Sequence, residues 1–284
     1  MSLKFIPLER TVVRIDGDDR VSFLNNFCTA DIKLLEPNEI TEAFILNGKG
    51  KIVAHVLVLC SADAIEFNTV AGQGGAIISH LDRYLIREDV TLSDISSQRK
   101  HVFVFGNLNE ATGLPEFNRF SDGKIQIAHC EAAGVGVLVS AANEQQVTDW
   151  ANQLGGCADD ESTLNLHRVQ FGTPWFGVDS SAENLPQELV RDEKAISFTK
   201  GCYLGQETVA RIDALGRVNK LMVKIQSAEK LSSGESLTLD DKMVGTLSSI
   251  AHDGTNWHGI SIVKRAAAKP GTVLKTELGT AKVV

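Results

Sequence analysis

The sequence of 284 residues carries a formal net charge of −8 and contains 43% hydrophobic and 23% charged residues. This length exceeds one typical domain, and the composition is ordinary for a soluble globular protein, so a largely disordered chain is excluded. The acidic balance disfavours non-specific binding to nucleic acid. No stretch approaches the roughly 20 apolar residues of a membrane helix, and we therefore expect no membrane partner.

The first half of the chain alternates strand and helix patterns. Residues 10–15, "RTVVRI", predict a strand, and Asp18 or Asp19 is expected to cap a helix over 20–28. Residues 42–60 give the clearest hairpin signal, because two apolar runs flank the turn "NGKG". In residues 74–89, apolar side chains recur at helical spacing and predict a helix packed on that sheet.

A second mixture of strands and helices follows. Strands are expected at 100–106, 124–130 and 134–140, and helices at 143–156 and 159–174. The second helix is expected to begin at Asp160 or Ser162 and to end at Gly172. Single helices alternate with strand runs without a regular βαβ rhythm, which favours the α+β class.

From Val218 onward the pattern is of short alternating strands with no helix signal. These residues predict a C-terminal β-barrel or sandwich. We expect three parts: a first α+β lobe at 1–98, a second at 99–215, and the barrel at 216–284. His252 and His258 fall in expected strands and are interpreted as surface residues, not metal ligands.

The five cysteines of the chain are an odd number, widely spread and without a Cys-x-x-Cys pair. This argues against a disulfide scaffold, a structural zinc site or a resident cluster held by cysteines alone. They are Cys28, Cys60, Cys130, Cys157 and Cys202.

The stretch "TKGCYLGQETVAR" places Cys202 in a turn between Gly201 and Gly205. Glycines free the backbone so that the thiol can project, and a helix beginning just beyond, with Lys200 and Arg211 nearby, would favour the thiolate. We interpret Cys202 as a reactive, partly exposed cysteine. The alternative is a turn before a helix in which Cys202 is a small apolar filler.

The segment "HRVQFGTPWFGVDSSAENLPQE" is unusual in combining aromatic and polar groups. Trp175 and Phe176 lie between glycines and near Arg168, Gln170 and Asp179. Aromatic faces with a few directed polar groups suit a flat heterocycle. An aromatic plug between lobes is the alternative.

"KGCYLGQE", followed by "VAR" and "LGRVNK", resembles the signature of the YgfZ family. These are folate-binding iron–sulfur cluster assembly and repair factors related to the aminomethyltransferase (T protein) of the glycine cleavage system. The blocks "VRIDGDDRVSFLNNFCTADI", "AFILNGKGKIVAHVLV", "YLIREDV" and the middle segment match in the same order. The resemblance implies two ferredoxin-like α+β lobes and a C-terminal β-barrel arranged as a ring around a central folate-binding hole.

The resemblance also implies a set of functional residues. Cys202, with Lys200 and Arg211, would be the reactive group, a transient cluster ligand with no permanent metal, because one thiolate cannot hold a cluster alone. Cations would meet the glutamate tail of tetrahydrofolate or a derivative, and aromatic rings would stack on its ring systems. The residues expected to bind folate are Arg168, Gln170, Trp175, Phe176, Glu188, Arg191, Tyr203 and Gln206.

Departures from the transferase pattern decide the expected activity. The hairpin that carries paired aspartates in the transferase, one of them catalytic, has Ala54 and His55 here. Gln170 corresponds to an acidic residue expected to grip the pterin edge, and Cys202 also stands where the transferase is acidic. Without the catalytic carboxylate, glycine cleavage activity is disfavoured.

Three functions stay open at this point. The favoured one is a tetrahydrofolate-binding accessory factor for iron–sulfur assembly or repair, whose partners are folate and iron–sulfur client or assembly proteins. The others are a folate-dependent one-carbon transferase and a catalytically inert adaptor. The resemblance also implies an involvement in tRNA modification without direct nucleic-acid binding. The location would be the bacterial cytoplasm, or the mitochondrial matrix if the source is eukaryotic.

Overall fold

A computed structural model describes residues 4–105, 125–130, 136–141, 143–153 and 157–284. The described residues form two compact units. The first unit comprises residues of 1–130, 135–159 and 193–208, and the second comprises residues of 131–134, 160–192 and 209–284. Neither unit is one continuous stretch of sequence.

One sheet of the first unit has the strand order β3-β4-β5-β2-β6, and all its pairs are antiparallel. The predicted hairpin is confirmed, because its two strands pair around a turn in which Asn47 N donates to Lys51 O at 2.9 Å. The strands are β2 (Arg10–Asp16), β3 (Ile40–Leu46), β4 (Ile52–Cys60), β5 (Ile65–Val70) and β6 (Thr91–Asp94).

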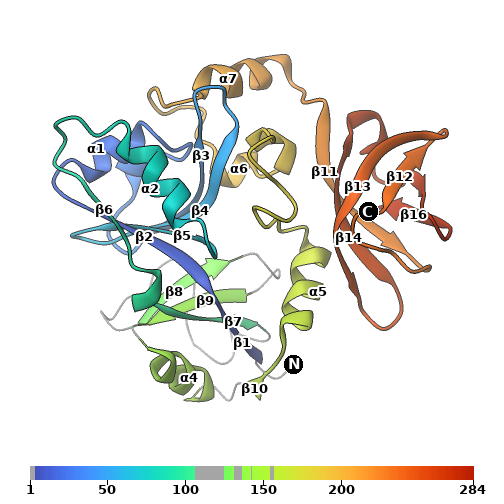
Figure 1. The fold of residues 1–284 in the computed structure, drawn as a ribbon, viewed down its shortest axis with the longest axis horizontal. Coiled ribbons are helices and arrows are strands. Elements are labelled where there is room, and N and C mark those ends of the chain that lie inside the picture. The colour runs from blue at the N-terminus through green and yellow to red at the C-terminus, as the bar shows by residue number, and fades with distance from the viewer. Residues whose placement is uncertain (1–3, 106–124, 131–135, 142, 154–156) are drawn as a thin grey trace. The chain divides into compact units, whose positions relative to one another are not determined.

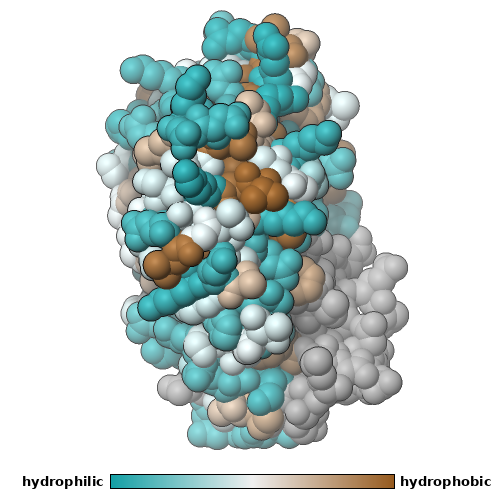
Figure 2. All heavy atoms as spheres, turned by 90° about the vertical axis from the view of Figure 1, so that its right-hand side faces the viewer, coloured by the Kyte–Doolittle hydropathy of each residue, from teal (hydrophilic) through white to brown (hydrophobic). Residues whose placement is uncertain are grey.

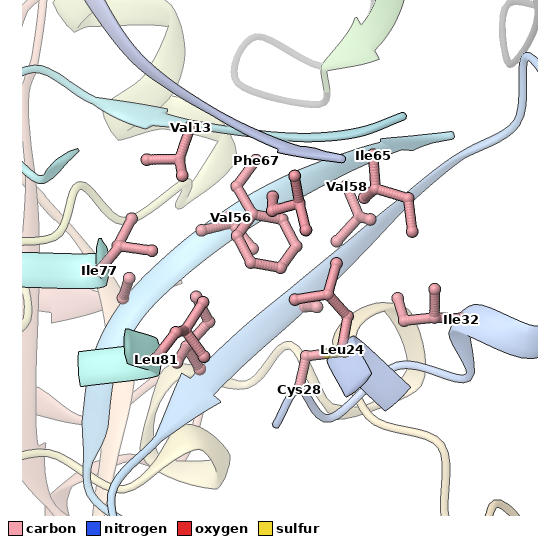
Figure 3. Close-up of a cluster of buried hydrophobic side chains, with 14 of the residues drawn as sticks. Val13, Leu24, Cys28, Ile32, Val56, Val58, Ile65, Phe67, Ile77 and Leu81 are labelled. Atoms are coloured by element: carbon pink, nitrogen blue, oxygen red, sulfur yellow. The ribbon is translucent and has the colours of Figure 1, made fainter. Parts of the chain in front are cut away.

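Helices α1 (Arg20–Asn25) and α2 (Gly74–Asp82) supply apolar side chains to the core on this sheet. Figure 3 shows Leu24 and Leu81 directed toward Val56, Val58 and Phe67. The predicted cap of α1 is wrong in its chemistry. Asp19 precedes the helix, but its side chain caps nothing and Oδ2 accepts instead from Asp89 N at 2.9 Å.

The second sheet of this unit has the order β10-β1-β7-β9-β8. Its first strand in sequence, β1, pairs antiparallel with β7, and the chain then passes at Glu9 into β2 of the other sheet. The expected strands and helix are confirmed within the described residues, whereas 106, 124, 134–135 and 154–156 lie outside them. The elements are β1 (Lys4–Leu8), β7 (Lys100–Phe105), β8 (Ile125–Cys130), β9 (Gly136–Ala141), β10 (Cys157–Ala158) and α4 (Glu144–Gln153).

The second unit contains a closed barrel of strand order β11-β14-β13-β12-β15-β16, which confirms the predicted C-terminal barrel (Figure 1). Leu237, Leu247 and Leu274 are fully buried inside it. Seen from the barrel side, the surface shows small separate hydrophobic patches among hydrophilic residues (Figure 2). The strands are β11 (Lys220–Ser227), β12 (Ser236–Leu239), β13 (Lys242–His252), β14 (Trp257–Lys264), β15 (Val273–Lys275) and β16 (Thr280–Val283).

Helix α5 (Glu161–Phe171) packs on the barrel through an apolar cluster that joins Val169 to Ala251 and Ile260. Its predicted ends are confirmed: Asp160 accepts from the amides of Ser162 and Thr163, and Gly172 is left-handed at φ 76°. Two further helices follow, α6 (Asp192–Ala195) and α7 (Gln206–Leu215). Short 3₁₀ helices span Ile32–Leu34, Ser96–Gln98, Pro186–Leu189 and Arg265–Ala267.

One antiparallel and one mixed sheet with few helices, together with a closed barrel, confirm the α+β class. Among the helices of the described residues, none is long and apolar enough to span a membrane.

Candidate functional site

Cys202 lies in an irregular loop between α6 and α7, and its thiol is free and exposed. A side chain on the neighbouring Gly201 would meet no atom within 4 Å, so the loop is open on that side. The expectation of an exposed cysteine at this position agrees with this geometry.

The side chain of Lys200 anchors the Cys202 loop to the first unit. Its ammonium is buried and donates to the carbonyl oxygens of Cys28 at 2.9 Å and Ala30 at 2.5 Å. Burial lowers the pKa of this ammonium, and it also lies 5.2 Å from the centroid of the Tyr203 ring. The amine of Lys200 is therefore engaged by backbone carbonyls of the first unit.

Three more hydrogen bonds fix the same loop to the segment after α1. Leu204 N donates to Asn26 O and Ser197 N donates to Thr29 O, both at 2.9 Å. The fully buried Thr29 hydroxyl donates to Ala195 O at 2.5 Å. Because the bonds lie on both sides of Cys202, the backbone that carries the thiol is fixed before any partner arrives.

Two glycines allow the loop to approach the β3–β4 hairpin closely. Gly205 has φ +83°, and a Cβ there would lie 2.6 Å from the Asn47 carbonyl oxygen. Gly50 in the hairpin has φ +75°, and its Cβ would lie 2.6 Å from Thr208 Cβ. The hairpin turn and the motif "KGCYLGQE" thus form one packed structure, for which both positions need glycine.

The aromatic and polar middle segment belongs to the second unit and is built around a buried ion pair. Arg168 Nη1 lies 2.6 Å from Asp179 Oδ2, and the same carboxylate oxygen accepts from Trp175 N at 2.9 Å. The guanidinium carbon of Arg168 lies 4.4 Å from the Trp175 ring centroid, a cation–π contact. Burial lowers the pKa of Arg168, while the adjacent Asp179 opposes that shift.

Two serines of barrel strand β13 form further hydrogen bonds with this ion pair. The hydroxyls of Ser248 and Ser249 each donate to Asp179 Oδ1 at 2.6 Å, and Arg168 Nη2 donates to Ser249 Oγ at 2.6 Å. Trp175 is therefore held on both its backbone and its ring. Among the described residues, the buried polar atoms of this unit without a hydrogen-bond partner include Arg168 Nε, Ser180 Oγ and Gln187 Oε1.

Gln170, the penultimate residue of α5, lies beside the β13–β14 turn. Its Nε2 lies 3.3 Å from His258 Nε2, and that His258 nitrogen lies 2.6 Å from Asp253 Oδ2. The His258 side chain is 13% exposed, so it is more buried than the interpretation as a surface residue implies. His252 instead contacts Trp257, with ring centroids 4.9 Å apart.

The other residues of the second unit that were expected to bind folate lie in different environments. Glu188 is buried, and its carboxylate accepts from Asn184 Nδ2 at 2.8 Å and from Leu185 N, so it stabilises its own turn. Phe176 is half-buried. Arg191 lines a groove of about 340 Å³ together with Lys224 and several apolar side chains.

The sequence-predicted residues fall in two groups. Cys202, Lys200, Tyr203 and Gln206 belong to the first unit, while the remaining seven belong to the second, including the exposed Arg211 on α7. Sequence reasoning missed Thr29, Asp253 and Lys224. The Asp253 turn "DGTN" between two strands was a readable signal, but nothing in the sequence marked the other two.

Ala54 and His55, the hairpin residues where the resemblance implies the transferase carboxylates, carry no acid. Ala54 is fully buried in β4, and His55 Nε2 lies 2.6 Å from Glu42 Oε1 while its ring stacks on Phe44. Within the described residues, no group of three or more His, Cys, Asp or Glu side chains could hold a metal ion.

No family model matches the chain, but several individual proteins are similar to it. A chloroplast protein of Arabidopsis thaliana is 24% identical over 92% of this chain and 65% of its own length. The tRNA-modifying protein YgfZ of Colwellia psychrerythraea is 27% identical over 76% of this chain and 68% of its own length. A mitochondrial homologue of the iron–sulfur cluster assembly factor IBA57 in Mycosarcoma maydis is 24% identical over 76% of this chain and 55% of its own length.

Among solved structures, the crystal structure of the glycine cleavage system aminomethyltransferase T from Bartonella henselae superposes with a TM-score of 0.85. It covers 99% of this chain and 85% of that chain at 16% identity, which shows a shared fold. Several YgfZ proteins are 25–27% identical to this chain over 70–90% of its length. In sequence the chain is similar to YgfZ proteins, and it has the fold of aminomethyltransferase T.

Proposed function

We propose that this chain is a tetrahydrofolate-binding accessory protein for iron–sulfur cluster assembly or repair, with Cys202 as its reactive thiol. The observation that carries the proposal is an exposed, free cysteine on a loop whose backbone is fixed on both sides. Relatives named for tRNA modification and for iron–sulfur cluster assembly support it.

The thiol is suited to a transient contact rather than to permanent storage of a cluster. One thiolate offers one ligand, whereas an iron–sulfur cluster usually takes four. Because the described residues contain no group of three or more His, Cys, Asp or Glu side chains that could hold a metal, a transferred cluster would complete its coordination with ligands of a partner protein. The same thiolate could instead attack a sulfenic acid of a client, forming a mixed disulfide with release of water, and a second thiol such as a free low-molecular-weight thiol would then release the client thiol and be oxidised.

The middle segment supports folate as the ligand. The half-buried Trp175, fixed in place by Asp179 and Arg168, offers a preorganised aromatic surface to a flat ring system. The buried polar atoms of Ser180 and Gln187 without partners fit a ligand that carries hydrogen-bonding groups.

The glutamate tail is anionic and needs a cationic contact beside an apolar wall. Arg191 and Lys224 line one groove with apolar walls, which suits a carboxylate on an apolar stem. We therefore assign the tail to this pair and leave Arg168 the task of holding Trp175.

A one-carbon transferase is the second candidate, because the fold is that of aminomethyltransferase T. The fully buried Ala54 and the pairing of His55 with Glu42 argue against it, since neither Ala54 nor His55 carries a carboxylate and the nearby Glu42 is engaged by His55. An inert adaptor would leave the fixed, exposed thiol without a role.

We infer the cellular location of the chain from the relatives to which it is similar. We propose the bacterial cytoplasm or the mitochondrial matrix, because a bacterial YgfZ and a mitochondrial homologue of IBA57 are both similar to the chain. The link to tRNA modification would run through the iron–sulfur enzymes that the protein serves. Its net charge of −8 disfavours direct binding to RNA.

Anaerobic calorimetric titration with tetrahydrofolate tests the ligand. Binding should weaken about tenfold in Trp175→Ala, because the stacking surface is lost, and should persist in Cys202→Ala. Absence of binding to the unmodified chain would remove folate from the proposal.

Recovery of an oxidatively inactivated [4Fe–4S] dehydratase tests the thiol. The chain should accelerate recovery, and Cys202→Ser should abolish the effect. Cys157→Ser is the matched control, because it changes another exposed cysteine of the same unit. Equal recovery with all three proteins would favour the adaptor.

A further inference from the structure

Val190 has a backbone conformation that a β-branched residue rarely adopts. Its φ of 57° and ψ of 43° lie in the left-handed region. Among the described residues, the non-glycine residues with positive φ are Asn38, Val190, Asp240 and Asp241, and of these Val190 alone has a β-branched side chain. Asparagine and aspartate tolerate the left-handed region, whereas a β-branched residue is strained there. The turn at Val190 therefore lowers the stability of the chain that contains it.

Burial of the Val190 side chain does not offset this strain. The residue is 59% exposed, so folding removes little of its apolar surface from water. The turn itself does not need a valine, because a left-handed residue after a helix is usually glycine or asparagine. A contact made by the isopropyl group with a bound ligand would give the strained residue a purpose.

The groove of about 340 Å³ in the second unit is where such a contact would form. Val190 and Arg191 both line this groove, together with the exposed Phe171. Successive side chains of an extended chain point to opposite sides, and the left-handed turn at Val190 avoids this arrangement. The strained conformation thus brings an apolar and a cationic side chain, adjacent in sequence, to one groove.

The chain before Val190 is fixed in position. The 3₁₀ helix Pro186–Leu189 directly precedes the turn, and all its residues are buried. Gln187 Nε2 donates a hydrogen bond to Val209 O at 2.9 Å. Because the chain enters the turn in a fixed direction, the conformation of Val190 determines where Arg191 lies.

Lys224, the second cation of the groove, is held in a different way. A Cβ at Gly172 would lie 3.1 Å from Lys224 Cγ and Cδ, so the stem of this lysine packs on the glycine that follows α5. The Lys224 backbone oxygen accepts from Val284 N at 3.0 Å. A change at Val190 should therefore affect Arg191 and leave Lys224 in place.

We propose that Val190 is a positioning residue for the tail of folate: its strained turn holds Arg191 in the groove with Lys224, and its isopropyl group packs on the apolar stem of the bound tail. The inference rests on the folate function proposed above and adds a residue that acts on the tail alone. Binding of the tail removes the Val190 side chain from water and so offsets the strain of the turn.

Val190→Asn tests this role, because asparagine adopts the left-handed region readily but lacks the apolar surface. Without ligand, the variant should unfold at a temperature about 2–4 °C higher. Its affinity for tetrahydrofolate and for p-aminobenzoylglutamate, which is the tail without the pterin, should fall about tenfold in calorimetric titration. Its affinity for tetrahydrobiopterin, which has the pterin ring but no glutamate tail, should not change.

Two variants serve as controls. Val190→Ile keeps the β-branched apolar side chain and should match the unmodified chain in stability and in affinity for all three ligands. Val273→Asn changes an exposed valine of β15 that does not line the groove, and it should leave the three affinities unchanged.

The outcomes separate the role of Val190 from the folate function. If Val190→Asn is no more stable than the unmodified chain, or if it binds the ligands that carry the tail as tightly, the proposal is overturned while folate binding stands. An equal loss of affinity for tetrahydrobiopterin would also overturn it, because the effect would not lie in the tail. Binding of none of the three ligands to the unmodified chain overturns the folate function and the tail contact together.

Discussion

Gly205→Ala should destabilise the first unit and loosen the loop that carries Cys202. A left-handed backbone costs an alanine about 1–2 kcal/mol, and the new Cβ would lie 2.6 Å from the Asn47 carbonyl oxygen and 3.0 Å from Gly50 Cα. Since both of these are backbone atoms, the loop and hairpin must separate. The hydrogen bond from Thr208 Oγ1 to Lys49 O, worth about 1 kcal/mol, would then be lost as well.

The expected loss is therefore about 2–4 kcal/mol in the free energy of unfolding. Urea denaturation followed by far-ultraviolet circular dichroism measures it, and hydrogen exchange over residues 197–208 shows whether opening is local. Gly201→Ala is a matched control in the same loop, because its Cβ would meet nothing within 4 Å. If the two variants differ by less than about 0.5 kcal/mol, the close packing of loop on hairpin is refuted.

Three further outcomes follow from buried groups of the first unit. Lys200→Met should accelerate hydrogen exchange in residues 197–204 by about thirtyfold, since about 2 kcal/mol of hydrogen bonding to two carbonyls is lost, whereas the exposed Lys49→Met should not. Burial lowers the pKa of His101 to about 3 from 6.5, so the unfolded chain binds the proton first as the pH falls. Stability should thus drop by about 4 kcal/mol from pH 6.5 to about pH 3, and this drop should vanish in His101→Gln; an unchanged profile would contradict it. Cys28, buried and with its pKa raised to about 11, should resist alkylation at neutral pH until unfolding, while Cys202 reacts in the native state; mass spectrometry that finds Cys28 labelled first would contradict this.

Much of the fold could be predicted because its signals are local. The turn at Asn47, the alternation of "VNKLMVKI" and the glycine after α5 each act within a few residues, and all three elements formed as expected. The pairing of β1 with β7 could not be predicted. It joins residues about a hundred positions apart, and no local pattern records such a partner.

In the candidate site, too, features set by local sequence could be predicted, whereas contacts set by the tertiary fold could not. Exposure of Cys202 followed from its flanking glycines, a local property. The engagement of Lys200 by Cys28 and Ala30, and of Arg168 by Asp179 and Ser249, depends on groups brought together only by the tertiary fold. Sequence reading therefore found the charged residues but not the groups with which Lys200 and Arg168 form hydrogen bonds.

The interleaving of the two units has a consequence for synthesis of the chain. Residues 193–208 complete the first unit, yet they follow residues 160–192, which belong to the second. While the ribosome produces this stretch, the sheets of the first unit can already pair, but the carbonyls of Asn26, Cys28, Thr29 and Ala30 still lack their final donors. The segment that carries the thiol is thus the last to join its unit, so Cys202 takes its fixed position only after the rest of that unit has been made.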